Sequence, residues 1–174
     1  MIEFTINQDF PAGLDRLWAT FGRPEYPRQK YLSLGATEVC LRLFRASTQV
    51  IEVELDRDAP VDPNRLPTWA RAFAASKQLL HHSTRWRRVG PARVTGELEI
   101  TPVGLPVRAH GVGAIVETTV GTSCMTLNWQ VRARLPIMGR SMEQLFSDEL
   151  RGALDADHAF TVGYLQRAVT AGDA

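Results

Sequence analysis

The strongest constraint on the fold is a long run of alternating apolar and polar residues, from about residue 37 to residue 135. In the segment GTSCMTLNWQVRARL, every second residue from Met125 to Leu135 is apolar, and the residues between them are mostly polar. A period of two places neighbouring side chains on opposite faces of a β-strand. The run therefore predicts a sheet with one polar and one apolar face, and the apolar face needs a cover.

The alternation divides into segments that predict six strands after Gly35, and IEFTI at residues 2–6 predicts a further strand at the start. Short links such as VGPA and TTVGT join neighbouring segments, so the strands should pair antiparallel. The residues expected on the covered face include Val39, Leu41, Leu43, Ile51, Val53, Leu55, Val94, Gly96, Leu98, Ile100, Val107, Ile115, Met125, Leu127 and Trp129.

Apolar residues at helical spacing, bounded by proline or glycine, predict helices in the other segments. The first covers residues 11–21 and the second lies around residues 24–34. A third, short helix starts at Pro67 and holds Trp69 and Phe73. The predicted order is therefore strand, two helices, six strands with a short helix among them, and a final long helix.

That final helix is predicted from about Ser141 to Val169, because Pro136 and Gly139 break the last strand. It is the only predicted element long enough to lie across the apolar face of the sheet. A curved sheet that wraps around one long helix leaves a gap in which a ligand can bind. On a helical wheel, one stripe of this helix holds Met142, Phe146, Leu150, Ala153, Phe160, Tyr164 and Ala168.

Length and charge exclude several classes of protein. The 174 residues suit a single domain, residues 1–174, with a formal net charge of +1. This balance does not favour nucleic acid or an anionic membrane as partner. The basic stretch RWRRVGPAR lacks a supporting basic face, so it is interpreted as a solvated hairpin turn. No run approaches the roughly 20 apolar residues of a membrane span.

The two cysteines, Cys40 and Cys124, are expected to stay reduced, because their strands should lie far apart in the sheet. The first residues show neither the basic nor the apolar region of a signal peptide, so a cytoplasmic location is expected. No cofactor motif or metal-type cysteine spacing is present, and neither a cofactor nor a metal is predicted. The GVGA at residues 111–114 opens no helix; its glycines are expected to let the sheet bend, or to let the helix or a ligand approach.

Two adjacent histidines, His81 and His82, suggest chemistry but cannot chelate one ion from a strand, since they point to opposite faces. Trp86 shares its parity with His82 and is expected to face inward, so His82 should look into the covered side and His81 into solvent. The ordinary interpretation of His82 is a hydrogen-bonded histidine of the core or its rim. The functional alternative is contact with a ligand.

Asp157 falls within the apolar stripe of the long helix. A carboxylate that faces an apolar cavity must be paired, neutralised or hydrated. His82 and Tyr164 are candidate partners. Three interpretations remain open: a bend of the helix turns Asp157 outward, Asp157 is a polar anchor in the cavity, or it is a catalytic acid or base. Asp155 and His158 are expected to form a surface pair instead of a site.

Three segments carry a resemblance to a known family: LPTWARAFAASKQLLHHSTRW, ELEITPVGLPVRAHGVGAIVE, and VRARLPIMGRSMEQLFSDEL running into AFTVGYL. With the order of elements, they resemble the SRPBCC superfamily, whose fold is START-like and similar to birch-pollen allergen. Within it, the bacterial family of unknown function numbered 2505 looks closest. The resemblance implies an α+β helix-grip fold, in which a curved antiparallel sheet of about seven strands wraps around a long C-terminal helix. It implies no catalytic residues, because that family carries no established catalytic motif.

Three functions follow as hypotheses: a carrier or binding module for a hydrophobic small molecule, a cyclase- or aromatase-type enzyme using Asp157 and His82 as acid and base, and an interaction protein with a filled core. The oligomeric state stays open. If a cavity exists, Trp129 should form or adjoin its floor. The residues predicted to line it are His82, Trp86, Met125, Leu127, Trp129, Met142, Phe146, Asp157, Phe160 and Tyr164.

Overall fold

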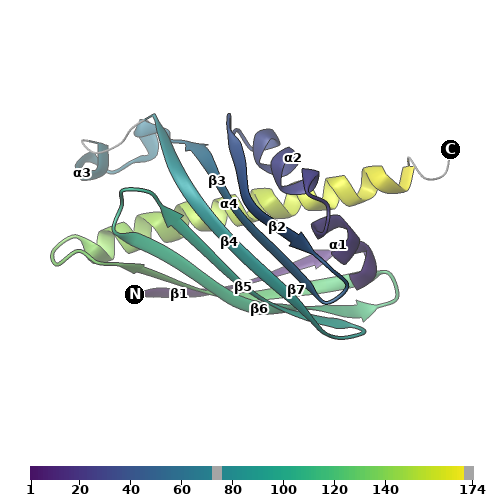
Figure 1. Cartoon of the computed structure of the whole chain (residues 1–174). Helices are drawn as coiled ribbons and strands as arrows, with labels where there is room; N and C mark the ends of the chain where they lie inside the picture. Colours follow the sequence, from purple (N-terminus) through teal and green to yellow (C-terminus); the bar gives the residue numbers. More distant parts are fainter. Residues whose placement is uncertain (72–75, 171–174) are drawn as a thin grey trace.

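A seven-stranded antiparallel sheet forms one layer of the molecule and the helix α4 lies across it (Figure 1). The computed structural model describes residues 1–71 and 76–170. The strand order is β1-β7-β6-β5-β4-β3-β2. The elements are β1 (Ile2–Phe10), α1 (Leu14–Phe21), α2 (Glu25–Ser33), β2 (Val39–Ala46), β3 (Val50–Pro60), η1 (Pro63–Arg65), α3 (Thr68–Arg71), β4 (Lys77–Gly90), β5 (Arg93–Pro102), β6 (Val107–Thr119), β7 (Thr122–Ala133) and α4 (Gly139–Thr170).

This architecture confirms the predicted α+β helix-grip fold with its order of strands and helices. Consecutive strands from β2 to β7 are neighbours, and β1 closes the order beside β7. In Figure 1, α4 runs behind the strands, and α1 and α2 lie near its C-terminal half. Of the described helices, none is sufficiently long and apolar to cross a membrane. Phe73, predicted in the third short helix, lies outside the described residues.

The predicted inner face is correct for most strands but wrong for Leu43. A β-bulge in β2 lies between Leu41 and Leu43. Leu43 therefore pairs with Glu54 on the outer face, and Phe44 takes the inward place opposite Val53. A bulge inserts one extra residue into a strand, which reverses the face on which every later side chain lies. The first strand also extends to Phe10, beyond the predicted residues 2–6.

Two tryptophans on the inner face each lie over a glycine of the next strand. Trp86 pairs with Gly96, and a Cβ atom at Gly96 would lie 2.2 Å from the Trp86 ring. Trp129 pairs with Gly111, where a Cβ atom would lie 2.9 Å from the indole. At Gly111 in the GVGA segment, the group that approaches the backbone is this tryptophan ring and not the expected helix. Glycine leaves each indole room to lie against the sheet.

The buried face of α4 is not the predicted apolar stripe. The stripe residues Met142, Phe146, Phe160 and Tyr164 are only half-buried, and Ala153 is exposed. The side chain of Ala168 lies outside the described part of the chain. Leu150 belongs both to the predicted stripe and to the buried face. Among the described side chains and glycines of α4, the buried residues are Gly139, Glu143, Ser147, Leu150, Leu154, Thr161 and Leu165.

The reason for this displacement is that polar side chains occupy part of the buried face. Glu143 accepts a hydrogen bond at 3.0 Å from the backbone nitrogen of Ala133, and Thr161 lies 2.6 Å from the hydroxyl of Tyr26. Buried polar groups are tolerated when such bonds satisfy them. The predicted stripe was built from apolar residues only. It is therefore rotated around the helix axis relative to the face that is actually buried.

The basic β4–β5 hairpin is held against α1. Arg88 forms an ion pair with Asp15 at 2.7 Å, and its guanidinium lies 5.2 Å from the ring centre of Trp18. Trp86 of the same stretch points inward and is 5% exposed, as predicted. These contacts fix α1 beside the sheet, and α2 follows it toward α4 (Figure 1).

Candidate functional site: a cavity between the sheet, α2 and α4

A cavity of about 140 Å³ lies between the inner face of the sheet, α2 and α4. For scale, an engineered apolar cavity of about 150 Å³ holds benzene. Aromatic residues of the helical side and leucines of α4 form the walls, among them Phe21, Tyr26, Tyr31, Leu150 and Leu154. The floor is formed by side chains of four strands: Ile51, Val53, Leu55, Trp86, Leu98, Ile100, Met125, Leu127 and Trp129.

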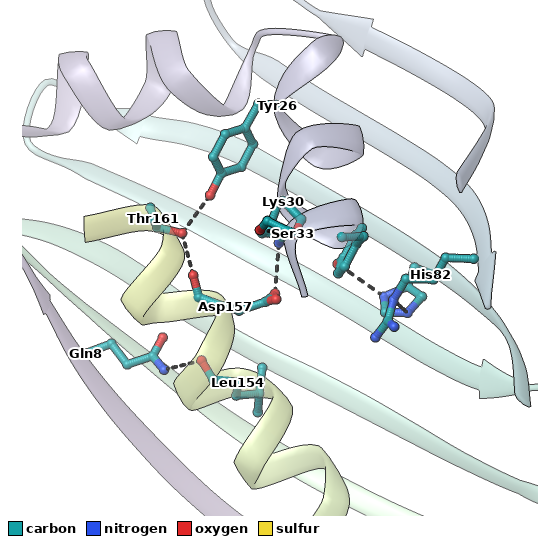
Figure 2. Close-up of polar contacts among 10 residues, drawn as sticks. Gln8, Tyr26, Lys30, Ser33, His82, Leu154, Asp157 and Thr161 are labelled. Atoms are coloured by element: carbon teal, nitrogen blue, oxygen red, sulfur yellow. Dashed lines mark hydrogen bonds and ion pairs between the residues drawn. The ribbon is translucent and has the colours of Figure 1, made fainter. Parts of the chain in front are cut away.

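Polar side chains join α2 to α4 along one side of this cavity (Figure 2). Lys30 donates a hydrogen bond from Nζ to Asp157 Oδ2 at 2.8 Å, and the two form an ion pair. Thr161 donates its hydroxyl proton to the carbonyl oxygen of Asp157 at 2.7 Å. Because a hydroxyl has one proton, Tyr26 is the donor in its 2.6 Å bond with Thr161. Asp157 and Thr161 therefore fix α2 over the cavity.

His82 lies on the inner face, as predicted, and both of its ring nitrogens have partners. Arg57 donates from Nε to His82 Nε2 at 3.1 Å. This bond places the proton of the neutral imidazole on Nδ1, which then donates to the hydroxyl oxygen of Tyr31 at 3.4 Å. Burial lowers the pKa of His82 well below its ordinary value, and the charges of Arg57 and Lys30 lower it further. His82 is therefore neutral at pH 7.

The lysine and the tyrosines of α2 keep their protons. Burial lowers the pKa of Lys30, but the combined effect of Asp157 and the two tyrosines outweighs it, and the pKa rises above its ordinary value. Burial raises the pKa of Tyr31 and of Tyr26. The cavity thus presents one ammonium and two neutral phenols along α2.

The structure brings six of the ten predicted site residues together around the cavity: His82, Trp86, Met125, Leu127, Trp129 and Asp157. The other four do not line it. Met142 and Phe146 pack against the core elsewhere along α4. Phe160 and Tyr164 pack against the ring of Tyr26, with ring centres at 6.1 and 5.3 Å. They follow the predicted stripe, which is rotated away from the buried face.

Two predicted pairings are replaced by others. Asp157 is neither turned outward nor paired with His82 or Tyr164, because Lys30 binds it. His158 does not pair with Asp155. It lines the cavity and lies with Nε2 2.7 Å from the carbonyl oxygen of Asp9. Its ring packs edge-on against Phe10, with the ring centres 5.0 Å apart.

Sequence reasoning missed Lys30, Tyr31 and Arg57. A signal for Lys30 and for Arg57 was present. Tyr26 and Lys30 are four residues apart in EYPRQKYLS, a spacing that places both on one face of a helix. Arg57 shares its parity with Val53 and so lies on the inner face. A charged residue at an inward position of a strand is a site candidate that the search for apolar residues passed over.

Metal binding finds no support in the described part of the chain. Within residues 1–71 and 76–170, no group of three histidine, cysteine, aspartate or glutamate side chains is placed to hold an ion. The two cysteines are free; Cys40 is exposed on β2 and Cys124 is half-buried on β7. The strand order places four other strands between these two.

Solved structures with the same fold differ strongly in sequence. The Zhui aromatase/cyclase from Streptomyces sp. R1128 is 13% identical, with a TM-score of 0.58, and the match covers 97% of this chain and 95% of that one. A START superfamily protein from Mycobacterium smegmatis is 10% identical, with a TM-score of 0.54 and coverages of 95% and 98%. Norcoclaurine synthase from Thalictrum flavum, in complex with dopamine and hydroxybenzaldehyde, is 13% identical, with a TM-score of 0.54 and coverages of 93% and 87%.

At these identities the likeness shows the fold alone, which is that of the START-like SRPBCC proteins. No curated protein matches the sequence. The family model described as "Protein of unknown function (DUF2505)" matches residues 5–165, nearly the whole chain. The chain therefore belongs to this family of unknown function.

Proposed function

We propose that the protein binds a hydrophobic small molecule in the cavity between the sheet, α2 and α4, and carries or presents it unchanged. The observation that supports this proposal is the cavity itself, whose volume of about 140 Å³ lies over an apolar floor. Concave, mostly apolar cavities with a few convergent polar groups are typical ligand sites. An interaction protein with a filled core is less favoured, because side chains leave this volume open. A cytoplasmic setting is part of the proposal, since the exposed Cys40 thiol suits a reducing compartment.

The arrangement of polar groups favours binding over catalysis. An enzyme of the cyclase type would use Asp157 and His82 as acid and base. Asp157 is held by Lys30, and the two nitrogens of His82 are bonded to Arg57 and Tyr31. A general base needs a free lone pair within reach of the proton it abstracts, and His82 has none, because Nε2 accepts from Arg57 and Nδ1 carries its own proton. The same groups serve well as fixed polar anchors at one side of an apolar cavity.

The proposal is tested by native mass spectrometry of the purified protein and by titration with a fluorescent apolar probe. Ile100 lines the cavity, so Ile100→Trp should fill it and abolish binding of the probe. The matched control is Thr101→Trp, the same change at the next residue, which points to the outer face beside His81. The control should bind the probe as the wild type does. A wild type that purifies without ligand and binds no probe would contradict the proposal and favour the interaction protein.

A further inference from the structure

Arg57 is a cation of the cavity without a carboxylate partner. Its side chain lies on the inner face of β3, lines the cavity and is half-buried. Its Nε donates to His82, and its guanidinium carbon lies 4.5 Å from the ring centre of Tyr31. Among the residues that the structure describes, no acidic side chain forms an ion pair with Arg57. Its two terminal nitrogens, Nη1 and Nη2, therefore remain available at the cavity.

The charges that line the cavity do not balance. Lys30 and Arg57 contribute two positive charges, and Asp157 contributes one negative charge that is already bound to Lys30. Both cations lie over the Tyr31 ring, each 4.5 Å from its centre. His82 is neutral and adds no charge, since Nε2 accepts a hydrogen bond from Arg57 and Nδ1 carries the single ring proton. A net positive charge faces an otherwise apolar space.

We infer that the ligand of this cavity is a small apolar molecule that carries a carboxylate, and that the carboxylate binds Nη1 and Nη2 of Arg57. The inference rests on the proposed function and names the chemical class of its ligand. A guanidinium presents two parallel N–H donors that match the two oxygens of a carboxylate. The apolar part of the ligand would then lie on the floor formed by Trp86 and its neighbours.

The surrounding groups support this orientation. The bond from Arg57 Nε to His82 Nε2 fixes the plane of the guanidinium, so little side-chain freedom is lost when a ligand binds. The Tyr31 hydroxyl accepts from His82 Nδ1 and keeps its own proton, which makes it a second donor on the same side of the cavity. The negative charge of Asp157 does not repel the carboxylate of the ligand, because Lys30 neutralises the charge of Asp157.

The size of the cavity sets the probes for the test. Its volume of about 140 Å³ is comparable to that of a cavity that holds one benzene ring. Benzoate carries one ring and one carboxylate, benzyl alcohol is a neutral molecule of similar shape, and benzylamine reverses the charge. Binding of the three to the whole protein is measured by calorimetry or by NMR chemical shifts at the same ionic strength.

The wild type should bind benzoate at least about tenfold more tightly than benzyl alcohol, which corresponds to a charge-assisted hydrogen-bonded pair. Benzylamine should bind most weakly. Arg57→Gln should remove the preference for benzoate over benzyl alcohol, so that the ratio of the two affinities falls to about one. The matched control is Arg108→Gln on the exposed side of β6, which changes the net charge equally and should retain the preference.

The outcomes separate the two proposals. If benzyl alcohol binds and benzoate does not bind more tightly, the carboxylate inference is overturned while the proposed function stands. If no probe binds, both are overturned. Should Arg57→Gln fail to fold, the order of the three probes on the wild type still decides the inference. Arg57→Lys provides a second variant: it keeps the charge but loses the fork, so it should retain only part of the preference for benzoate.

Discussion

Lys30 Nζ lies 2.8 Å from Asp157 Oδ2, and this ion pair joins α2 to α4 across 127 positions of the sequence. The side chains are 15% and 25% exposed, so the pair is largely removed from solvent. Both residues line the cavity, and Lys30 neutralises the only aspartate on the cavity side of α4 among the described residues. The pair therefore holds α2 and α4 together beside the cavity.

Replacing one partner of this pair should destabilise the protein. Lys30→Met leaves the Asp157 carboxylate partly buried and unpaired. We expect a loss of about 2 kcal/mol in the free energy of unfolding. This is less than the loss for a fully buried pair, because both side chains keep some exposure to solvent. The double variant Lys30→Met with Asp157→Leu should recover most of this loss, because no uncompensated charge remains. Denaturant unfolding of the single and double variants measures the coupling.

The control for this cycle is the exposed pair of Arg42 and Asp56, which are 2.7 Å apart while the Arg42 side chain is 60% exposed. Arg42→Met should cost clearly less stability than Lys30→Met, as is typical of exposed pairs. Equal losses in the free energy of unfolding for Lys30→Met and Arg42→Met would contradict this structural role of the Lys30–Asp157 pair.

Gly96 should not tolerate a side chain. The Cβ atom of Gly96→Ala would lie 2.2 Å from the Trp86 ring, so the indole must move into the cavity. We expect a loss of about 1–3 kcal/mol from overpacking, together with weaker probe binding. Gly152→Ala is the control, because nothing lies near that position on α4 and the change should stabilise the helix by up to about 1 kcal/mol. An unchanged midpoint for Gly96→Ala would show that the ring does not lie over Gly96.

Trp129 is both packed and part of the cavity floor. Its side chain is 1% exposed, so Trp129→Ala should cost about 3–5 kcal/mol, the loss expected of a fully packed tryptophan. Removal of the indole also enlarges the cavity, and the affinity for a small apolar probe should change. Trp69→Ala, at a half-buried position of α3, is the comparison and should cost clearly less. A small loss at Trp129 would indicate an open cavity wall instead of a packed one.

The neutral state of His82 predicts a pH dependence of stability. The pKa of His82 is lowered in the folded protein by burial and by Arg57 and Lys30, while the unfolded chain titrates near the ordinary value of about 6.5. Below that pH the unfolded state binds a proton that the folded state does not. The stability from His82 is therefore complete above about pH 6.5 and falls by up to about 1.4 kcal/mol per pH unit below it.

The window between about pH 6.5 and 5 isolates this effect, because the paired carboxylates titrate at lower pH. Hydrogen bonds lower the pKa values of Asp56, Asp58 and Glu143, so their contributions are lost only as the solution becomes more acidic. His82→Gln should flatten the slope in this window. Urea unfolding at a series of pH values gives the measurement.

The two thiols should differ in reactivity. Cys40 is exposed, whereas burial and the neighbouring Asp9 raise the pKa of Cys124. Since the thiolate is the reactive form, Cys40 should react first with a thiol reagent in the native protein. Cys40→Ser should remove the fast phase. Denatured, unreduced protein should give two thiols, and a count of zero would mean that a disulfide had formed.

The sequence by itself determined the sheet, its inner face and its cover. Alternation at Ile51, Met125 and Trp129 is a property of a few neighbouring residues, and so is the helical spacing after Pro136. It also placed His82 on the inner face from the parity of one strand. Such patterns need no knowledge of distant segments, because the geometry of a strand or helix repeats within a few residues.

Only the tertiary structure decided the register of β2, the partners of the buried polar side chains and the volume of the cavity. One bulged residue reverses Leu43, which local alternation cannot reveal. Lys30 meets Asp157 only because α2 and α4 pack together, and the buried face of α4 includes Ser147 because the fold places it there. An open cavity is the small difference between the volume enclosed by the backbone and the volume of the side chains inside it. That difference depends on how all the elements pack, so it is absent from any local pattern in the sequence.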